Sequence, residues 1–476
     1  MDVPSSSRSP SPSPPVPFQA RVAPPPRPLM PPGVVFQDQK EYQYFCHFRD
    51  VTAVEFSTGF EPALWNALVL QACDNPSILR LTVATAALSL ATKGSQPAAR
   101  DFEKDAHHQH ALQQYGEALK GIREMVAMGQ DSMRIALISA LLIFCFESLH
   151  GDLGRAIVHV QSGIDMIVKR ISNTPRQYYF SRVKSAGVGS SGAIDDDLLT
   201  AFMRLDRPSL TLLSKRKDNR PLLTSRIFTL LFAEEHLEIP RGFATTAEAR
   251  VYLEDLKWRV LTTTQPPDTV KSFWQEDLDD TRTPDLGAVP LELKQWYEGS
   301  GVLNSTSNLG LEFAHWHDAF SPLLNYAMSP AGDGMFIGAV TLHVQALAAD
   351  LLISGSCGSL TSVPGVSSSS SGTGNMNRFP TVYAIISFCR RLVAHPRFLK
   401  GFVFDIGIIP SLVKVIMVCP DRRLKLEAIN VLKSMEPRRE GVWDSTAVAR
   451  AGEISLEQED GQMDLDMIDP NLLEAM

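Results

Sequence analysis

Cysteine is scarce in this sequence, and the cysteines stand far apart. Only six occur among 476 residues, and no two of them form a C-x-x-C pair. Small zinc modules and disulfide scaffolds need closely spaced cysteines, so the residues present favour neither class. Reduced thiols in an intracellular compartment are predicted instead. The first residues, MDVPSSSRSPSPSPPVP, also lack the apolar core of a secretory signal.

The sequence has no excess of positive charge either. The formal net charge is −8, and all of it comes from residues 451–476, which hold eight acidic side chains and no lysine or arginine. Residues 1–450 balance 45 basic against 45 acidic side chains. A neutral body argues against a chain that binds nucleic acid through overall basic charge.

A strongly apolar run in the first third of the chain is too short to cross a membrane. Ile135 to Phe146 is twelve residues without a charge, whereas a bilayer needs roughly 18 to 20. The run lies within Asp131 to His150, which is too long for an ordinary strand and therefore predicts a helix. Because apolar residues occur on every face, neighbours must cover this helix all round. We expect it to be the central helix of a soluble core.

Helical spacing recurs along the chain, and no strand-like alternation of useful length appears. The predicted class is all-α, a multi-helix bundle or array of antiparallel helices. The expected helices are 65–72, 79–91, 100–128, 153–171, 195–205, 222–237, 246–261, 291–297, 311–328, 336–353, one from about 382, 411–418 and one from about 421.

Composition divides the chain into three parts. Residues 1–38 are a Pro/Ser-rich arm, with 12 of the 32 prolines before residue 34, and we predict that it is disordered. Residues 39–445 form the helical domain, with halves at about 39–171 and 195–445 and with Gly/Ser-rich loops at 172–194 and 355–377. Residues 446–476 are an acidic tail.

One stretch matches a nucleotide-binding pattern by its letters alone. Gly187 to Gly192 reads GxGxxG, but a dinucleotide site needs a strand before it and a helix start that attracts phosphate after it. Here three aspartates, 195–197, occupy that start and would repel an anion. A flexible linker is the better interpretation. We assign no catalytic or cofactor-binding residue and predict that the protein is not an enzyme.

Histidines gather in two places. His107, His108 and His110 cluster on one expected helix beside Asp105, and His107 with a residue one turn away could form a transition-metal patch, but exposed helical histidines are the favoured interpretation. His315 and His317 flank a tryptophan, and we interpret them as core or rim histidines rather than catalytic ones. No metal ligand is assigned.

Two segments suggest contacts with other proteins. Lys215, Arg216 and Lys217 form the best basic cluster, which fits either a nuclear-import signal or, as we favour, a solvated loop. The acidic tail mixes its carboxylates with apolar residues, the pattern of an acidic activation segment, although a solubilising tail would look similar. Its candidate contact residues are Leu465, Ile468, Leu472 and Leu473.

Several strings resemble the regulatory domain of fungal zinc binuclear cluster (Zn2Cys6) transcription factors, over about residues 40–445. The closing strings are Cys419–Arg423, Glu427–Leu432 and Arg439–Ser445; the earlier ones are Leu137–Ser139, Phe146–Glu147, Gly151–Asp152, Ala156, His159–Gly163 and Leu205–Asp206. This resemblance implies an all-α region of a nuclear transcription regulator, in many members one that controls secondary metabolism.

The residues of the closing strings also have a plain structural interpretation. Arg439 to Ser445, REGVWDS, is expected to be a packing and turn element, with Trp443 covering the end of the core. Arg422, Arg423, Lys425 and Lys433 are expected on the solvated face of the last helix. We assign no ligand contact to either group.

The sequence departs from this family in one respect. Members usually carry six closely spaced N-terminal cysteines that hold two zinc ions and place a helix in the DNA major groove. Here the first cysteine is Cys46, inside the helical block, so no zinc ligand, cofactor or DNA-reading residue can be transferred. Either the cluster has been lost, or the recorded start misses an upstream exon.

We therefore expect a nuclear transcription regulator that acts through its helical domain and acidic tail on a specialised metabolite gene set. Its partners would be coactivators or a DNA-binding partner protein, and homodimers and heterodimers are both open. Direct DNA contact is not favoured, and no membrane contact is expected. The alternative is a co-regulator or scaffold that dimerises with a DNA-binding partner. An all-α metabolite-binding protein or enzyme is less favoured.

Overall fold

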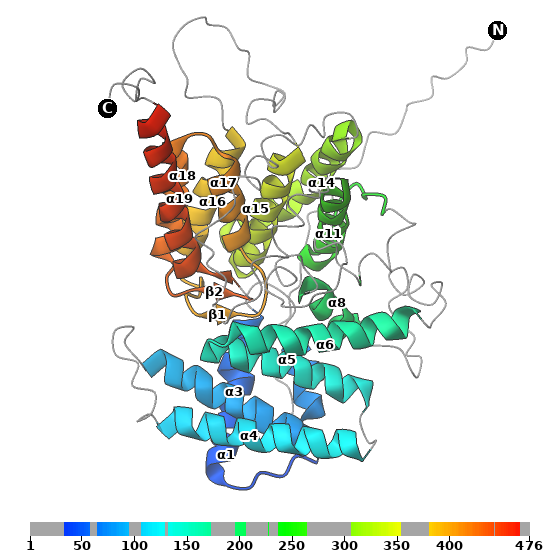
Figure 1. The fold of residues 1–476 in the computed structure, drawn as a ribbon. Coiled ribbons are helices and arrows are strands. Elements are labelled where there is room, and N and C mark those ends of the chain that lie inside the picture. Colours follow the sequence, from blue (N-terminus) through cyan, green and yellow to red (C-terminus); the bar gives the residue numbers. More distant parts are fainter. Residues whose placement is uncertain are drawn as a thin grey trace, which may run out of the picture. The chain divides into compact units, whose positions relative to one another are not determined.

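The computed structural model describes ten stretches of the chain, all within the unit Pro31–Met476. They are residues 33–57, 64–94, 106–128, 132–172, 196–205, 227, 237–263, 306–353, 380–441 and 443–466. Helices dominate these stretches (Figure 1), and the only strands in them are three of two residues each. The predicted all-α class is confirmed.

A first group of helices surrounds one apolar core. Its α-helices are α1 (Gln39–His47), α2 (Ala53–Phe56), α3 (Pro76–Gly94), α4 (Ala106–Ala127), α5 (Met133–His150), α6 (Leu153–Ser172) and α8 (Asp196–Leu205). Between α1 and α3 the chain forms the π-helices Phe48–Thr52 and Leu64–Val69 and the 3₁₀-helix Ala72–Asp74. The short elements replace part of the single helix expected at 65–72.

Helix α5 is buried as its sequence predicts. Ser132 caps its start, because the hydroxyl accepts a hydrogen bond from the Ile135 amide at 3.2 Å. Gly151 ends it with a φ of 101°, a left-handed conformation that glycine adopts without strain. Every residue from 137 to 148 is buried. The central position expected for this helix is confirmed for the first core.

A second group of helices encloses a separate core. It contains α11 (Thr246–Thr263), α14 (Thr306–Ala327), the 3₁₀-helix Pro330–Met335, α15 (Phe336–Ile353), α16 (Pro380–Val393), α17 (Ile409–Val418), α18 (Arg422–Ser434) and α19 (Ser445–Asp466). Helix α15 contacts α11, α14, α16 and α17 and is the centre of this core. The fold therefore has two central helices rather than the one expected.

In the stretches that the structure describes, two segments have the length and hydropathy of a membrane span. They are Met133–His150 and Pro330–Leu351, with 67% and 78% of their windows buried inside the fold. Both contain a central helix of one of the two cores, which accounts for their apolar character without a bilayer.

Helix α8 belongs to the first core, although we expected it to open the second half of the domain. Leu198, Ala201 and Phe202 are buried among the first-core residues. The ring of Phe202 packs where Gly163 of α6 has no side chain, and a Cβ at Gly163 would overlap that ring. Because α8 packs on α6, the first core includes α8, and the second core begins after it in the sequence.

The three strands form one small sheet. Strand β1 (Phe402–Val403) pairs in parallel with β2 (Arg439–Glu440), and β2 pairs antiparallel with β3 (Trp443–Asp444). Gly441 makes the turn between β2 and β3 with a φ of 59°. The packing and turn role predicted for Arg439–Ser445 is confirmed, since Trp443 packs against residues of both cores.

Part of the expected acidic tail is folded. Helix α19 begins at Ser445 and runs to Asp466, and Val448, Ala449 and Leu456 are buried in the second core. An open chain from residue 453 was expected because of charge repulsion. The first three turns of α19 hold only Glu453 as an acidic residue before Leu456, so repulsion is weak where the apolar face packs.

Candidate functional site

The two cores meet at the segment Gly401–Ile409, which we call the junction segment. Phe402 and Phe404 enter the first core. The Phe402 ring lies edge-to-face on Phe56 with 5.3 Å between the ring centroids, and the Phe404 ring lies edge-to-face on Trp65 with 5.2 Å between them. At its other end Ile408 and Ile409 are buried in the second core. This short segment is therefore tied into both.

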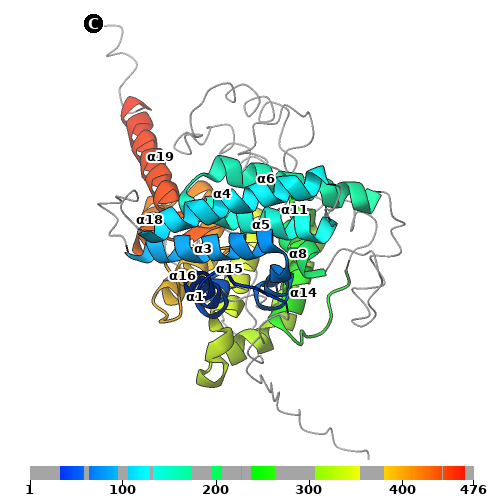
Figure 2. The same cartoon turned by 90° about the horizontal axis from the view of Figure 1, so that it is seen from below.

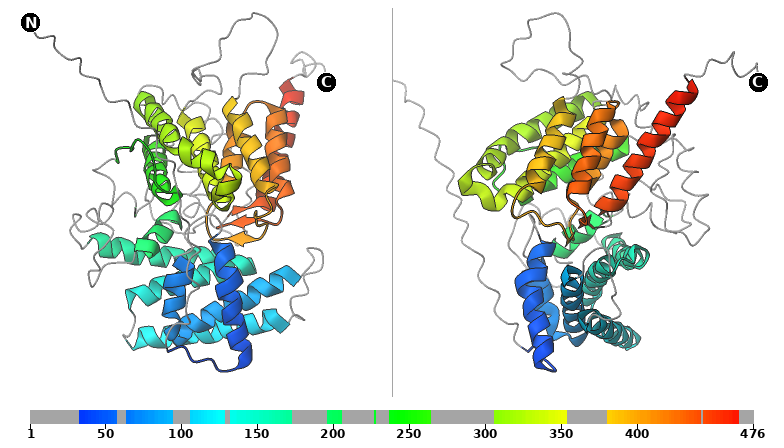
Figure 3. Two further views of the ribbon diagram at one scale, coloured as in Figure 1. Left: turned by 180° about the vertical axis from the view of Figure 1, so that it is seen from behind. Right: turned by 90° about the vertical axis from the view of Figure 1, so that its left-hand side faces the viewer.

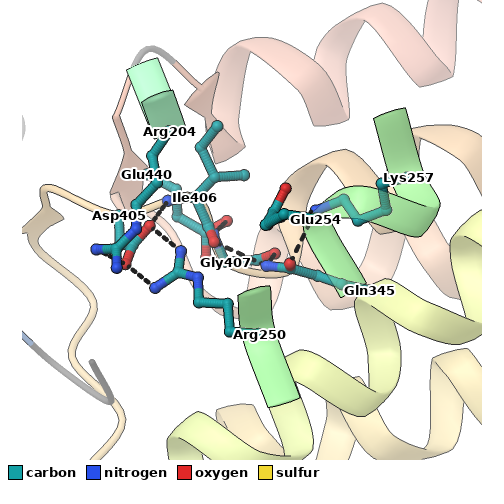
Figure 4. A network of polar contacts seen from close by, with 9 residues as sticks. All are labelled: Arg204, Arg250, Glu254, Lys257, Gln345, Asp405, Ile406, Gly407 and Glu440. Atoms are coloured by element: carbon teal, nitrogen blue, oxygen red, sulfur yellow. Dashed lines mark hydrogen bonds and ion pairs between the residues drawn. The ribbon is translucent and has the colours of Figure 1, made fainter. Parts of the chain in front are cut away.

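Asp405 is the polar centre of the junction segment (Figure 4). Arg250 of α11 donates to both of its carboxylate oxygens, at 2.6 and 2.5 Å, and Arg204 of α8 donates to one of them at 3.3 Å. All three side chains are buried. Burial by itself opposes ionisation, but the charges of Arg250 and Arg204 outweigh it and lower the pKa of Asp405 to about 2.

The next two residues of the junction segment are held through their backbone. The Gln345 side-chain amide of α15 donates to the carbonyl of Ile406 at 2.8 Å and to that of Gly407 at 3.0 Å. Lys257 donates in turn to the Gln345 side-chain oxygen at 3.2 Å and to Glu254 at 3.1 Å. Lys257 therefore fixes which way the Gln345 amide points.

Glu440 of β2 closes the network from the other side. Its Oε2 accepts hydrogen bonds from the amides of Gly407 at 3.0 Å and Ile409 at 2.9 Å, and its Oε1 accepts one from Arg438 at 2.7 Å. The carboxylate fills the space where Gly407 has no side chain. Arg438 also lies over the ring of Phe398, 4.2 Å from its centroid.

The closing string reaches the first core through Arg439. Its Nη1 donates to the carbonyl of Ser148, near the end of α5, at 2.9 Å. Its Nε donates to Asp444 at 2.9 Å, and the other oxygen of Asp444 caps the start of α19. Arg439 therefore joins α5, β3 and the α19 cap.

The earlier string surrounds the same end of α5. Glu147 is buried and accepts a hydrogen bond from the Tyr115 hydroxyl at 2.6 Å. Burial and this hydrogen bond raise the pKa of Tyr115 well above its usual range. Asp152 caps α6, because its carboxylate accepts from the Arg155 amide at 3.0 Å. These residues shape the α5–α6 turn, which lies beside Arg439.

The chain matches no family model, no curated protein and no solved structure. In the part of the chain that the structure describes, no three or more His, Cys, Asp or Glu side chains are placed to hold a metal ion. What the contacts show is a network that couples five elements, α8, α11, α15, β2 and the junction segment.

The fold separates the first histidine cluster. His107 and His110 face Tyr44 of α1. The His107 Nδ1 lies 2.8 Å from the Tyr44 hydroxyl oxygen, and the His110 ring stacks on the Tyr44 ring with 4.9 Å between the centroids. His108 points elsewhere and stacks on His150 at 5.6 Å. It is 8% exposed, so the expectation of exposed histidines is wrong for this residue. The three rings do not share one site.

The second histidine pair also divides. His315 is exposed, whereas His317 faces His343 of α15 at 5.3 Å between ring centroids. The His317 Nε2 and His343 Nδ1 are buried without a hydrogen-bond partner. Burial lowers the pKa of each to about 4. The interpretation of His317 as a core residue agrees with this packing, and both rings are neutral at pH 7.

Other residues singled out in the sequence have different outcomes. Lys425 is buried, so the expectation that it lies on a solvated helix face is wrong. Lys215, Arg216, Lys217, Ile468, Leu472 and Leu473 lie outside the described residues, as do 1–32, Gly187–Gly192 and the segment 355–377. Leu465 lies within helix α19, where the structure describes its backbone but not its side chain.

Sequence patterns did not identify the residues of the junction network. Asp405 stands alone within the apolar run GFVFDIGII, and a lone carboxylate in such a run signals a buried partner. Nothing in the sequence indicates that the partners are Arg204 and Arg250, which are 201 and 155 residues away.

Proposed function

We propose that this protein is a transcription regulator of the fungal zinc-cluster type, acting in the nucleus through its helical domain and acidic tail. Its mechanism is recruitment, in which the helical domain is a platform and residues 457–476 contact coactivators. The genes it controls would belong to a specialised metabolic pathway. No catalytic step is part of this proposal.

One observation supports the proposal most directly. Arg439 of the closing strings donates a hydrogen bond to the carbonyl of Ser148, which lies 291 residues away between the earlier strings Phe146–Glu147 and Gly151–Asp152. These strings form the turn after α5, the small sheet and the α19 cap, a shared framework for a regulatory domain.

A reporter assay tests the recruitment mechanism. The full chain is fused to an unrelated DNA-binding domain, and a second fusion ends at Glu457, which keeps Val448, Ala449 and Leu456, the positions of α19 that pack in the second core among the described side chains. We expect the shorter fusion to lose activation, and the full fusion to lose it when Leu465, Ile468, Leu472 and Leu473 are replaced by alanine. Equal output from the two fusions would contradict recruitment through the tail.

A second form of the proposal has its own support in the cysteine positions. Cys73, Cys145, Cys389 and Cys419 are buried in the two cores, so these four thiols are committed to packing, and Cys46 lies half-buried in α1. This favours a co-regulator that reaches DNA through a DNA-binding partner. Purified full chain should then shift a promoter fragment only when that partner is added, and a shift by the chain alone would contradict this form.

A further inference from the structure

A run of cations ends α16 and leads into the junction segment. From residue 390 to residue 400 the sequence holds three arginines, one lysine and one histidine, and no acidic residue. The arginines and the lysine are all exposed. We call these four residues, Arg390, Arg391, Arg397 and Lys400, the basic edge.

Two members of the basic edge have acidic partners at the surface. Arg390 pairs with Glu427 of α18 at 3.2 Å, and Arg397 pairs with Asp333 at 3.3 Å. The two arginine side chains are still 55% and 60% exposed, so water and salt screen both pairs. Since a guanidinium has five N–H donors, each arginine can bind a further carboxylate.

The other two members have no acidic partner among the described residues. Arg391 lies over the rings of Phe336 and Phe388, 5.9 and 6.0 Å from their centroids, and Lys400 is exposed. The rings restrict the Arg391 guanidinium before any partner binds. The basic edge therefore carries more positive charge than the described side chains around it neutralise.

The same chain carries a segment of opposite charge. Residues 457–476, which we call the acidic segment, hold seven carboxylates and no lysine or arginine. The first half of this segment is the end of α19, which runs to Asp466. Figure 2 and the right panel of Figure 3 show this end of α19 pointing away from the other described helices.

Within one chain the two charged regions lie towards opposite ends of α19. Just after the basic edge, the carbonyl of Gly401 accepts a hydrogen bond from the amide of Arg439 at 3.2 Å. Arg439 belongs to β2, which pairs with β3, and β3 leads directly into the start of α19. The basic edge therefore ends near the beginning of this helix, whereas the acidic segment lies in its last turns and beyond.

The length of α19 opposes a contact within one chain. Its 22 residues span about 33 Å, and the ten residues after Asp466 reach at most about 35 Å when fully extended. They would have to run back along the whole helix to meet the basic edge, at the loss of nearly all their conformational freedom. Another molecule can supply the carboxylates without this loss.

We propose that the basic edge binds the acidic segment of a second copy of this chain. Two-fold symmetry makes the contact reciprocal, since the acidic segment of each copy meets the basic edge of the other. Charge selects this arrangement, because seven carboxylates complement four cations, whereas two acidic segments side by side would repel each other.

The pairing does not depend on the proposed function, but one consequence of it does. If the acidic segment contacts coactivators, the dimer competes with them for the same carboxylates. Recruitment would then decrease as the concentration of the chain increases.

Sedimentation of the full chain tests the pairing. We expect a dimer in about 0.05 M salt, and its dissociation constant should rise at least about tenfold in 0.5 M salt because salt screens exposed charges. Arg391→Glu with Lys400→Glu, the edge variant, should raise it at least about tenfold at low salt. The matched control is Lys120→Glu with Arg123→Glu, which makes the same change of charge at exposed positions of α4 and should keep the dimer.

Mixing two variants shows which surfaces meet. The second variant reverses four charges of the acidic segment, through Glu457→Lys, Glu459→Lys, Asp460→Lys and Asp464→Lys. Each variant by itself should be monomeric at a concentration where the parent is a dimer. Their mixture should form a heterodimer, because it keeps one unaltered edge facing one unaltered segment. The edge variant should unfold at about the parent's temperature, since both of its side chains are exposed.

Three results would overturn the inference. They are a parent chain that is monomeric at every concentration, a dimer that survives high salt or the edge variant, and a mixture that stays monomeric. Duplex DNA that binds the parent but not the edge variant, with no dimer formed, would replace the second copy with nucleic acid and also overturn it. The reporter fusions that end at Glu457 measure recruitment separately, so either proposal can fail without the other.

Discussion

Replacing Asp405 by asparagine should destabilise the whole fold. The substitution keeps the shape of the side chain but removes the charge that faces Arg204 and Arg250. The two arginines are only 6% and 4% exposed, so water cannot replace the lost carboxylate. Two buried arginine charges without an opposing carboxylate should lower the free energy of unfolding by about 3 to 5 kcal/mol.

The pKa of Asp405 provides a separate estimate of the same interaction. A pKa of about 2, against an ordinary value of 3.8, means that the folded chain favours the ionised form by about 2.5 kcal/mol relative to the unfolded chain. Because the pKa is lowered on folding, this stability is present above about pH 4 and is lost as the pH falls towards 2. Neutralising Asp405 should therefore cost at least this amount at pH 7.

Urea unfolding of the full chain at pH 7, followed by circular dichroism, measures the effect. Glu124→Gln is the control, since it neutralises an exposed carboxylate on α4 and should change the free energy of unfolding by less than about 0.5 kcal/mol. Combining Asp405→Leu with Arg204→Met and Arg250→Met should recover much of the loss, because no buried charge is then left unpaired. An asparagine variant as stable as the parent would refute the assignment of the junction network as a latch between the cores.

Three other substitutions or conditions give independent checks. Folding lowers the pKa of His317 and His343 from 6.5 to about 4, so the unfolded chain binds more protons than the folded chain below pH 6.5. The free energy of unfolding should therefore fall by about 1 kcal/mol per histidine between pH 7.5 and 5.5. Urea titrations at the two pH values should show a smaller fall when His317 and His343 are both replaced by phenylalanine. Gly163→Leu should cost about 1 to 3 kcal/mol by forcing Phe202 from its place, measured by thermal unfolding, and an unchanged midpoint would contradict that packing. Asp421→Ala should cost about 1 kcal/mol through loss of the α18 cap, whereas Asp421→Ser should cost less.

The junction segment couples the two cores. The junction segment places Phe402 and Phe404 in one core and Ile408 and Ile409 in the other. Asp405, between them, is bound by helices from both groups. A change that weakens this segment is expected to affect both cores at once, so the two should unfold together in the parent chain.

Local sequence was sufficient for most of the helices. The expected segments 153–171, 246–261 and 336–353 correspond closely to α6, α11 and α15, because apolar residues at helical spacing and cap residues act within a few turns. Burial of α5 was also predictable, since a helix that is apolar all round has no face to present to water. The two halves of the helical domain were also predicted, but the half to which α8 belongs was not, because it depends on Phe202 packing against Gly163 of α6.

The tertiary structure alone decided the pairing of distant charges and the course of the acidic segment. Which arginines face Asp405, and that Arg439 reaches Ser148, depends on how helices hundreds of residues apart are placed, and no local pattern encodes that distance. In α19 the composition of residues 453–476 predicted an open tail, but the helix that packs on α17 and α18 through its first half continues to Asp466. The local sequence thus determined the helices through short-range periodicity and capping, and long-range packing determined what they enclose.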